Sequence, residues 1–173
     1  MALINKVLPG YTATLWCQDD ATPTPLTDTQ LSTWSNVTTI IGTTAGGTGT
    51  AGIQVPVEAV PAFGSDDAVA AYSVAGARTG AKITTQNQVT SLNVTAAWNP
   101  ADTAQLLIRD DGYNGTIVRT YVVAVYDGTD TVAYAFNGMV GGMSWDMSPS
   151  AEGKFNFTIH PIGGNSYGWS NNT

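Results

Sequence analysis

The sequence TIVRTYVVAVY, residues 116–126, is the strongest strand signal in the chain. Its β-branched and aromatic residues favour extended backbone over helix. The next four residues, DGTD, are typical of a tight turn, and residues 131–140 (TVAYAFNGMV) have the composition of a returning strand. We therefore expect residues 116–140 to form an antiparallel hairpin.

Further strands are expected on both sides of this hairpin. Residues 154–159 alternate between apolar and polar side chains, with Phe155, Phe157 and Ile159 on one face, which is the pattern of a half-buried strand. The other strands are expected at residues 11–16, 34–41, 53–60, 69–75, 89–98 and 143–147.

Proline and glycine predict where these strands are irregular. Pro56 lacks an N–H, so the strand at 53–60 is expected at a sheet edge. Gly141 and Gly142 allow a bulge or bend before the strand at 143–147.

One helix is expected, opening at Asn99-Pro100 and ending near Asp111-Gly112. Together the elements predict an all-β, β-rich fold: an antiparallel β-sandwich or barrel-like domain with one short flanking α-helix.

The length of 173 residues predicts one domain, residues 1–173. Within it we expect an N-terminal arm at 1–10, a Gly-rich contact loop at 42–52, and a polar C-terminal tail at 162–173. The tail is expected to be either disordered or docked on a neighbouring subunit.

The composition favours a protein that assembles. Only 11% of the residues are charged, against about 25% in an average soluble domain. The outside of the fold is therefore either buried against other subunits or covered by uncharged Thr, Asn and Ser. The net charge is −7 and the six basic residues are dispersed, which argues against ordinary nucleic-acid binding.

Cysteine and hydropathy patterns set the expected compartment. The single cysteine, Cys17, excludes an intrachain disulfide. The first residues lack the apolar run of a secretory signal, and no stretch is long enough for a transmembrane helix, so we expect assembly in a cytoplasm and no membrane partner. Five Asn-x-Thr patterns, at Asn36, Asn93, Asn114, Asn156 and Asn171, are expected by chance in so Asn- and Thr-rich a chain.

No motif predicts an enzyme or a cofactor site. Residues 47–52 (GTGTAG) match G-x-G-x-x-G, but a proline-broken, strand-like segment follows where a dinucleotide site needs a helix. The only histidine, His160, precedes a proline at a strand end, and no G-x-S-x-G elbow accompanies it. We expect no catalytic, cofactor-binding or metal-binding residues.

Acidic pairs and tryptophans have simpler structural interpretations. The pairs Asp19-Asp20, Asp66-Asp67 and Asp110-Asp111 lack the glycine spacing of a calcium loop, although an incidental cation remains open. Five tryptophans could line a sugar-binding face: Trp16, Trp34, Trp98, Trp145 and Trp169. Of these, Trp16, Trp34 and Trp98 border strand candidates and are more simply core or interface anchors.

Three stretches between residues 92 and 161 resemble one known family. They are the strand-to-helix passage LNVTAAWNPADTAQLLIRDDGYNG, the long strand TIVRTYVVAVYDG, and the run AYAFNGMVGGMSWDMSPSAEGKFNFTIHP. In this pattern the chain resembles the major tail tube proteins of long-tailed, siphovirus-like bacteriophages.

The resemblance implies a virion tail protein, assembled in the host cytoplasm, without enzymatic activity or cofactor. Its partners would be other copies of itself, in stacked homohexameric rings, and the tape measure, tail terminator and distal tail proteins. DNA would pass through an acidic channel without specific binding, which suits the net charge.

Two other functions stay open. A β-sandwich binding or decoration module of a virion, carbohydrate-binding or immunoglobulin-like, would explain the Trp and Asn/Thr content. A small hydrolase would use the acidic residues and His160.

Overall fold

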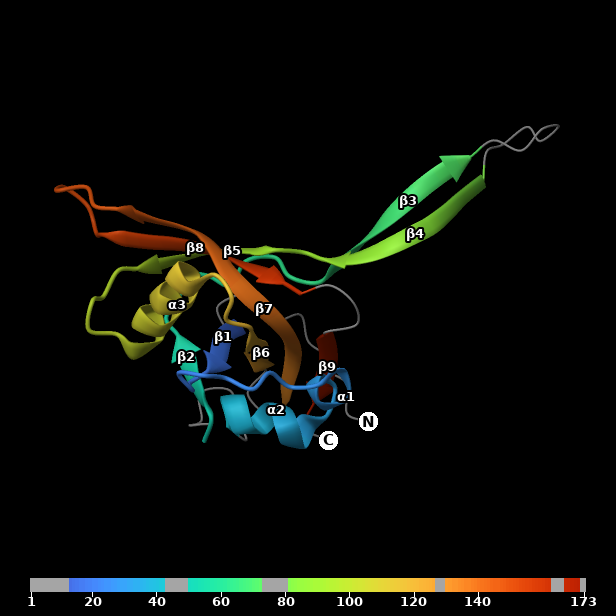
Figure 1. Cartoon of the computed structure of the whole chain (residues 1–173), viewed down its shortest axis with the longest axis horizontal. Coiled ribbons are helices and arrows are strands. Elements are labelled where there is room, and N and C mark those ends of the chain that lie inside the picture. Colours follow the sequence, from blue (N-terminus) through green and yellow to red (C-terminus); the bar gives the residue numbers. More distant parts are fainter. Residues whose placement is uncertain (1–12, 43–49, 73–80, 127–129, 163–166, 172–173) are drawn as a thin grey trace.

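The computed structural model describes residues 13–42, 50–72, 81–126, 130–162 and 167–171. Within these residues it has nine strands and three helices (Figure 1). They are β1 (Ala13–Gln18), α1 (Asp28–Leu31), α2 (Trp34–Ile41), β2 (Gly52–Val55), β3 (Ser65–Tyr72), β4 (Ala81–Val89), β5 (Leu92–Ala97), α3 (Thr103–Asn114), β6 (Arg119–Tyr126), β7 (Thr131–Asp146), β8 (Lys154–Pro161) and β9 (Tyr167–Asn171). The expected antiparallel, β-rich class is confirmed, but the expectation of one helix is wrong.

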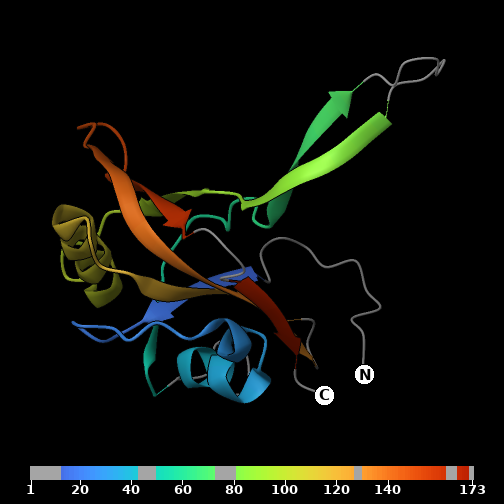
Figure 2. The same cartoon turned by 45° about the vertical axis from the view of Figure 1, so that its right-hand side comes forward.

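Two sheets make up the fold. The larger one has the order β2-β1-β6-β7-β8-β5, with β9 also paired to β7. Together with the three helices it is called the body here. The smaller sheet contains β3 and β4 alone and is called the ribbon; it projects away from the body (Figures 1 and 2). The expected arm at 1–10 and most of the Gly-rich loop lie outside the described residues.

The hairpin expected from residues 116–140 lies in the middle of the body. β6 and β7 pair antiparallel, with Tyr121 opposite Phe136 and Val123 opposite Tyr134. β1 adds to the other edge of β6, which places Leu15 opposite Val123. The strongest strand signal in the sequence is therefore the centre of the larger sheet.

The larger sheet nearly closes on itself. β2 ends at Val55, and the chain then reaches β5 at the opposite end of the sheet, where the Glu58 N–H donates to the Thr95 carbonyl at 3.0 Å. The Lys154 ammonium on β8 lies 3.0 Å from a Glu58 carboxylate oxygen. These contacts give the body the barrel-like character that the sequence predicts.

Both faces of the central strands are buried, but with different side chains. One face carries aromatic residues, among them Tyr121, Phe136 and Phe155, in the larger core cluster. The other carries the small residues Ala124, Ala133 and Ala135 in a second cluster, which contains residues of α1 and α2. Small side chains let a helix approach the sheet closely, so this face is covered by helices.

The strand expected at residues 34–41 is wrong, because this segment is helix α2. Its apolar residues follow helical spacing, with Val37, Ile40 and Ile41 buried in the second cluster. The helix ends at Gly42, whose φ of 79° is left-handed and whose N–H donates to the Thr38 carbonyl at 2.9 Å. Tertiary burial thus overrides the strand preference of its β-branched residues.

Helix α3 is present but shifted along the chain. Its N-cap is Asp102, whose side chain accepts from the Gln105 N–H at 2.9 Å, rather than Asn99. It passes through Gly112 and ends at Gly115, where φ is 67°. Glycine at 112 leaves room for the Met143 side chain of β7, which a Cβ there would meet.

The bulge expected at Gly141-Gly142 is confirmed. The pairing of β7 with β8 shifts register between Gly141 and Ser144, and Gly142 has a φ of 59°. β7 continues beyond the bulge to Asp146, so it is one strand where the sequence predicts two.

The C-terminal tail departs from both alternatives expected for it. Its residues 167–171 form β9, which pairs with β7 of the same chain and places Trp169 opposite Tyr134. Gly168 allows this docking because a Cβ there would lie 2.7 Å from the backbone nitrogen of Ser32, next to α1. In the described part of the chain, no helix has the length and apolar character needed to span a bilayer.

Candidate assembly surfaces

The ribbon is the first candidate for contact with another chain. Its strands pair from Ser65 opposite Val89 to Tyr72 opposite Ala81, with a register shift between Ala68 and Val69. Within the described residues neither strand pairs with the larger sheet. An isolated two-stranded hairpin is only marginally stable in water, so the ribbon is expected to gain stability from a partner.

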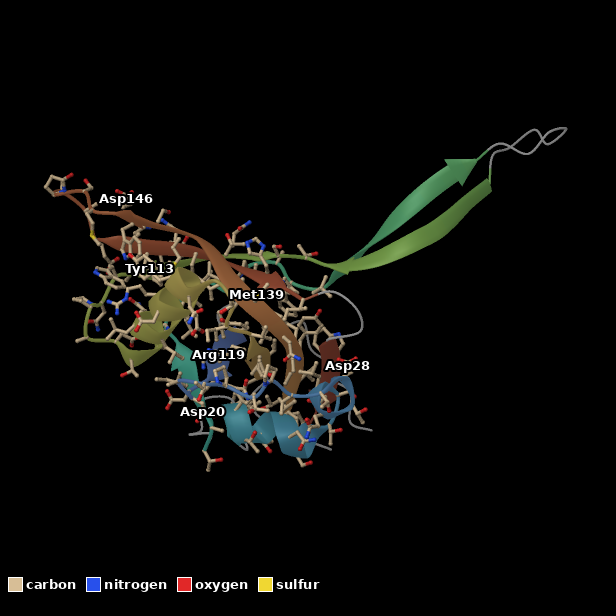
Figure 3. All side chains as sticks on the ribbon, in the orientation of Figure 1. Asp20, Asp28, Tyr113, Arg119, Met139 and Asp146 are labelled. Atoms are coloured by element: carbon tan, nitrogen blue, oxygen red, sulfur yellow. The ribbon has the colours of Figure 1, made fainter. Side chains whose placement is uncertain are left out.

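A second candidate is an aromatic patch formed by Trp98, Tyr113, Trp145 and Met147. The rings of Tyr113 and Trp145 stack with centroids 6.5 Å apart, and Trp98 meets Trp145 edge-on at 5.9 Å. Tyr113 is 71% exposed and Met147 55% exposed. Figure 3 shows Tyr113 on α3 at the same end of the molecule as Asp146 on β7.

Three acidic residues close in sequence to members of the aromatic patch are exposed. Asp146 and Glu152 are exposed, as is Asp110, which pairs with Arg109. Exposed aromatic and Met side chains within a polar rim are the usual anatomy of an interface hot spot.

Trp169 on β9 exposes a further aromatic surface. It is 53% exposed, and its ring packs against Tyr134 and Phe63 at centroid distances of 5.0 and 6.0 Å. Phe63 lies two residues before the ribbon begins, so this surface adjoins the base of the ribbon.

A shallow groove of about 670 Å³ lies beside the start of β1. One side is formed by Ala13 and Thr14, and the other by residues 56–60. Its lining is mainly aliphatic, which suits an apolar peptide segment better than a polar small molecule.

A buried polar network holds the body together at the start of β6. The Arg119 guanidinium forms a bidentate pair with Asp111, at 2.7 and 2.9 Å, and also donates to the carbonyls of Gln18 and Asp20. Arg119 is fully buried. Burial alone would lower the pKa of Arg119, but the hydrogen bonds and charge of Asp111 outweigh it, so the pKa is raised and the guanidinium stays charged.

The network continues through neutral side chains. Thr120 donates from its hydroxyl to Asn137 at 2.7 Å and accepts from the Leu26 N–H at 2.9 Å. The Asn137 amide donates to the Leu26 carbonyl, and Gln18 donates to the Thr24 carbonyl. These bonds fix the segment between β1 and α1 across the end of the sheet, which is a structural role rather than a catalytic one.

His160 lies in a setting that does not suggest catalysis. It is exposed near the end of β8, and its Nδ1 lies 3.1 Å from the Ser91 hydroxyl, so its contact is with a hydroxyl rather than an orienting carboxylate. The GTGTAG segment leads into β2, not into a helix, and its residues 47–49 lie outside the described residues.

The carboxylates of the pair Asp110-Asp111 are engaged separately. Asp110 and Asp111 turn to different arginines, Arg109 and Arg119. Among the residues that the structure describes, no group of three His, Cys, Asp or Glu side chains could hold a metal ion.

Sequence reasoning missed the Arg119 network, the groove and the aromatic patch. The network left a signal, because an arginine in the middle of TIVRTYVV is out of place in a strand buried on both faces. For the aromatic patch, the sequence indicated only that Trp98 could be a core or interface anchor. The other two arise from segments far apart in the chain.

By sequence, the chain matches no established protein family profile and no curated protein. By structure, it shares the fold of components of phage-tail-like contractile systems. It matches the PVC sheath/tube terminator of an extracellular contractile injection system, in the extended state, with a TM-score of 0.61 and 10% identity, over 99% of this chain and 100% of that one.

Two further matches come from the anti-feeding prophage. The cap that terminates its tube matches with a TM-score of 0.59 and 11% identity, over 100% of this chain and 95% of that one. A chain of its baseplate, determined with sixfold symmetry, matches with a TM-score of 0.56 and 9% identity, over 68% of this chain and 83% of that one. At such identities the likeness is one of fold, and it extends over the body and the ribbon in the sheath/tube terminator and the cap.

Proposed function

We propose that the protein is a non-enzymatic structural subunit of a phage-tail-like assembly, acting in the tube or at its end. The observation that carries this proposal is the end-to-end match with a sheath/tube terminator and a tube-terminating cap. A match restricted to a common β-core would support this function less, because one fold serves many functions. A subunit of a siphovirus tail tube is one narrower form of this proposal. A subunit of a ring that terminates a tube is another, and it agrees equally well with the proposal.

The subunits are proposed to form homohexameric rings that stack or cap a tube. The sixfold symmetry of the baseplate that contains a similar chain supports this number. The ribbon suggests how neighbouring subunits would join. Among the described elements its two strands pair only with each other, so their outer backbone edges are open to a strand of a neighbouring subunit.

Each subunit is proposed to be a single domain, residues 1–173, that contributes to an acidic channel. The net charge of −7 suits passage of DNA, because a negative wall repels phosphate and does not retain it. The partners would be further tail proteins, namely tape measure, terminator and distal tail proteins, and the location would be a tail or tail-like particle assembled in the host cytoplasm.

Native mass spectrometry and electron microscopy of the purified full chain test this proposal. Hexamers, rings or tubes are expected at high protein concentration over a range of salt. Monomers that stay folded but never associate, alone or with a co-expressed tube or tail-tip protein from the same gene cluster, would refute it.

A carbohydrate-binding decoration module is a second candidate, favoured by the exposed stack of Tyr113 on Trp145. Sugar rings pack on such aromatic faces. A glycan array would test it, with Tyr113→Ala as the variant that should lose any binding observed. An array without binding by the wild-type chain would remove this candidate.

A further inference from the structure

The outer part of β7 has an open backbone edge. At Gly138, β7 pairs with Arg119 of β6 on one edge and with Pro161 of β8 on the other. β8 continues along β7 as far as Asp146, whereas the pairing with β6 ends at Gly138. Within the described residues, no strand pairs with residues 139–146 on the edge that β6 leaves. An unpaired edge of this kind can accept one more strand.

The side chains along this open edge alternate in character. Ser144 and Asp146 are exposed and polar. The Trp145 ring between them belongs to the aromatic patch, where it stacks with Tyr113. A strand that adds here therefore meets polar positions on one face and an aromatic position on the other.

Negative charge gathers at the same end of β7. Lys154 is opposite Asp146 on β8. The pKa of Lys154 is raised, chiefly by its hydrogen bond and ion pair with Glu58 and further by the charges of Glu152 and Asp146. Three carboxylates thus act on one ammonium group, so a cation from another molecule is attracted to this end.

The ribbon has the complementary charge on one of its strands. In the sequence, the charged residues between Asp67 and Asp102 are Arg78 and Lys82, both basic. Of these, Lys82 lies on β4, one residue from the far end of the described ribbon. β3 instead contains Asp66 and Asp67. Among the described strands β4 pairs with β3 alone, so β4 offers both an open edge and the opposite charge.

We propose that β4 of a second copy of this chain adds to the open edge of β7, with Lys82 opposite Asp146. Opposite charges directly across a sheet stabilise such a pairing. The same register sets Ile83 opposite Trp145, so the apolar residue of β4 meets the aromatic patch. A shift by one residue would set Ile83 against the exposed Asp146 or Ser144. This inference rests on the self-association in the proposed function and names its contact.

The extents of the two strands select the antiparallel orientation. From Lys82 opposite Asp146, an antiparallel β4 continues to Thr84 opposite Ser144 and stays within its strand. A parallel β4 would instead present residues that precede its first residue, Ala81. Antiparallel pairing therefore makes the longer contact.

The placement of the two elements requires a second molecule. The ribbon and the outer end of β7 lie at opposite ends of the chain (Figures 1 and 2), and Figure 3 shows Asp146 at the end away from the ribbon. Each copy would donate β4 to one neighbour and accept β4 from another. Such a head-to-tail contact gives a closed ring when the rotation between copies closes, which is the assembly that the proposed function needs.

Disulfide trapping in the full chain tests this contact. Thr84→Cys is combined with Ser144→Cys, because residues opposite each other in an antiparallel pair have Cα atoms about 4.5 to 5.5 Å apart, within reach of a disulfide. The control combines Thr84→Cys with Ser35→Cys, an exposed serine on α2, away from the open edge (Figure 1). Cys17 can stay, because it is fully buried.

We expect the pair at 84 and 144 to form bonds between chains about tenfold faster than the control pair, because docking raises the local thiol concentration. The product should be a ladder of linked oligomers. An equimolar mixture of the two single variants should give linked dimers and nothing larger. Equal rates in the test and control pairs would overturn the inference. Bonds that form as fast between two Ser144→Cys chains would also overturn it, because they indicate a symmetric contact.

Charge reversal gives a second test that needs no thiol. Asp146→Lys should raise the concentration at which half of the chains assemble by about threefold, because like charges then face each other, and Lys82→Asp in the same chain should restore it. Rings that form without the bond and without this rescue would overturn the inference and leave the proposed function standing. Chains that stay monomeric in every test would overturn both. Thermal unfolding of each reduced variant confirms that it is folded.

Discussion

The body and the ribbon differ in how each obtains its stability. In the body, the central strands are buried on both faces, and a charged network ties β1, α3 and β6 together. In the ribbon, β3 and β4 pair with each other, and within the described residues they add to no other sheet. The body has two buried core clusters of its own, whereas the described strands of the ribbon pair only with each other.

The largest effect is expected from breaking the buried ion pair of the body. Arg119→Ala leaves Asp111 buried without its charge partner and leaves two carbonyls without a donor. It should lower the free energy of unfolding by about 3 to 5 kcal/mol. Urea denaturation measures the loss. The double variant Arg119→Met with Asp111→Leu should recover much of it, and an equal loss in both variants would contradict the ion-pair explanation.

A smaller loss is expected where β9 meets α1. Gly168→Ala places a methyl group 2.7 Å from the Ser32 backbone nitrogen, so the strand or the helix must shift. We expect a destabilisation of about 1 to 3 kcal/mol, together with faster proteolysis at the C-terminus. Ser170→Ala, on the same strand, is the control. Equal protease resistance in wild type and Gly168→Ala would mean that β9 does not dock as described.

The thiol of Cys17 gives a pH test of the body. Burial raises its pKa from the ordinary 9.0 to about 12. Between these two pH values the thiol keeps its proton in the folded chain and loses it in the unfolded chain. The contribution of this group to stability is complete below pH 9 and declines as the pH rises towards 12. Urea denaturation at increasing alkaline pH should show a shallower decline for Cys17→Ala than for wild type. Identical slopes would show that the thiol is not buried in solution.

The smallest effect on stability is expected in the ribbon. Ala70→Pro removes one backbone N–H from β3, where Ala70 is opposite Ile83. Because the ribbon adds little to the core, the body should lose less than about 0.5 kcal/mol, while ring formation should be abolished.

Thr103→Pro is the matched control for the ribbon variant. Thr103 is the first residue of α3, where proline is well tolerated. Rings formed by Thr103→Pro but not by Ala70→Pro would place the assembly contact on the ribbon. Rings formed equally by both would move it to another surface.

Elements that local sequence determines are predicted well, and elements that distant contacts determine are not. The β6–β7 hairpin and the alternation of Phe155, Phe157 and Ile159 were predictable, because local composition and a period of two determine them. Helix α2 was misread as a strand, because its β-branched residues favour extended backbone until tertiary burial selects the helical face.

Polar segments were the other source of error. β4 (AKITTQNQV) and β9 (YGWSN) have little apolar periodicity, and each becomes a strand because a distant or neighbouring strand supplies its hydrogen bonds. The groove and the aromatic patch could not be predicted from the sequence for a related reason. Both bring together segments that are separated by dozens of residues.

The bond between Arg119 and the Gln18 carbonyl has a consequence for synthesis on the ribosome. The two residues are 101 positions apart, and they join the central strand β6 to β1. At about 5 to 20 residues per second, roughly 5 to 20 seconds pass before β6 follows β1 out of the ribosome. During that interval Leu15, Trp16 and Cys17 have β2 beside them but lack their main partner strand. Until β6 is made, the nascent chain therefore lacks the strand that covers one edge of β1 in the folded protein.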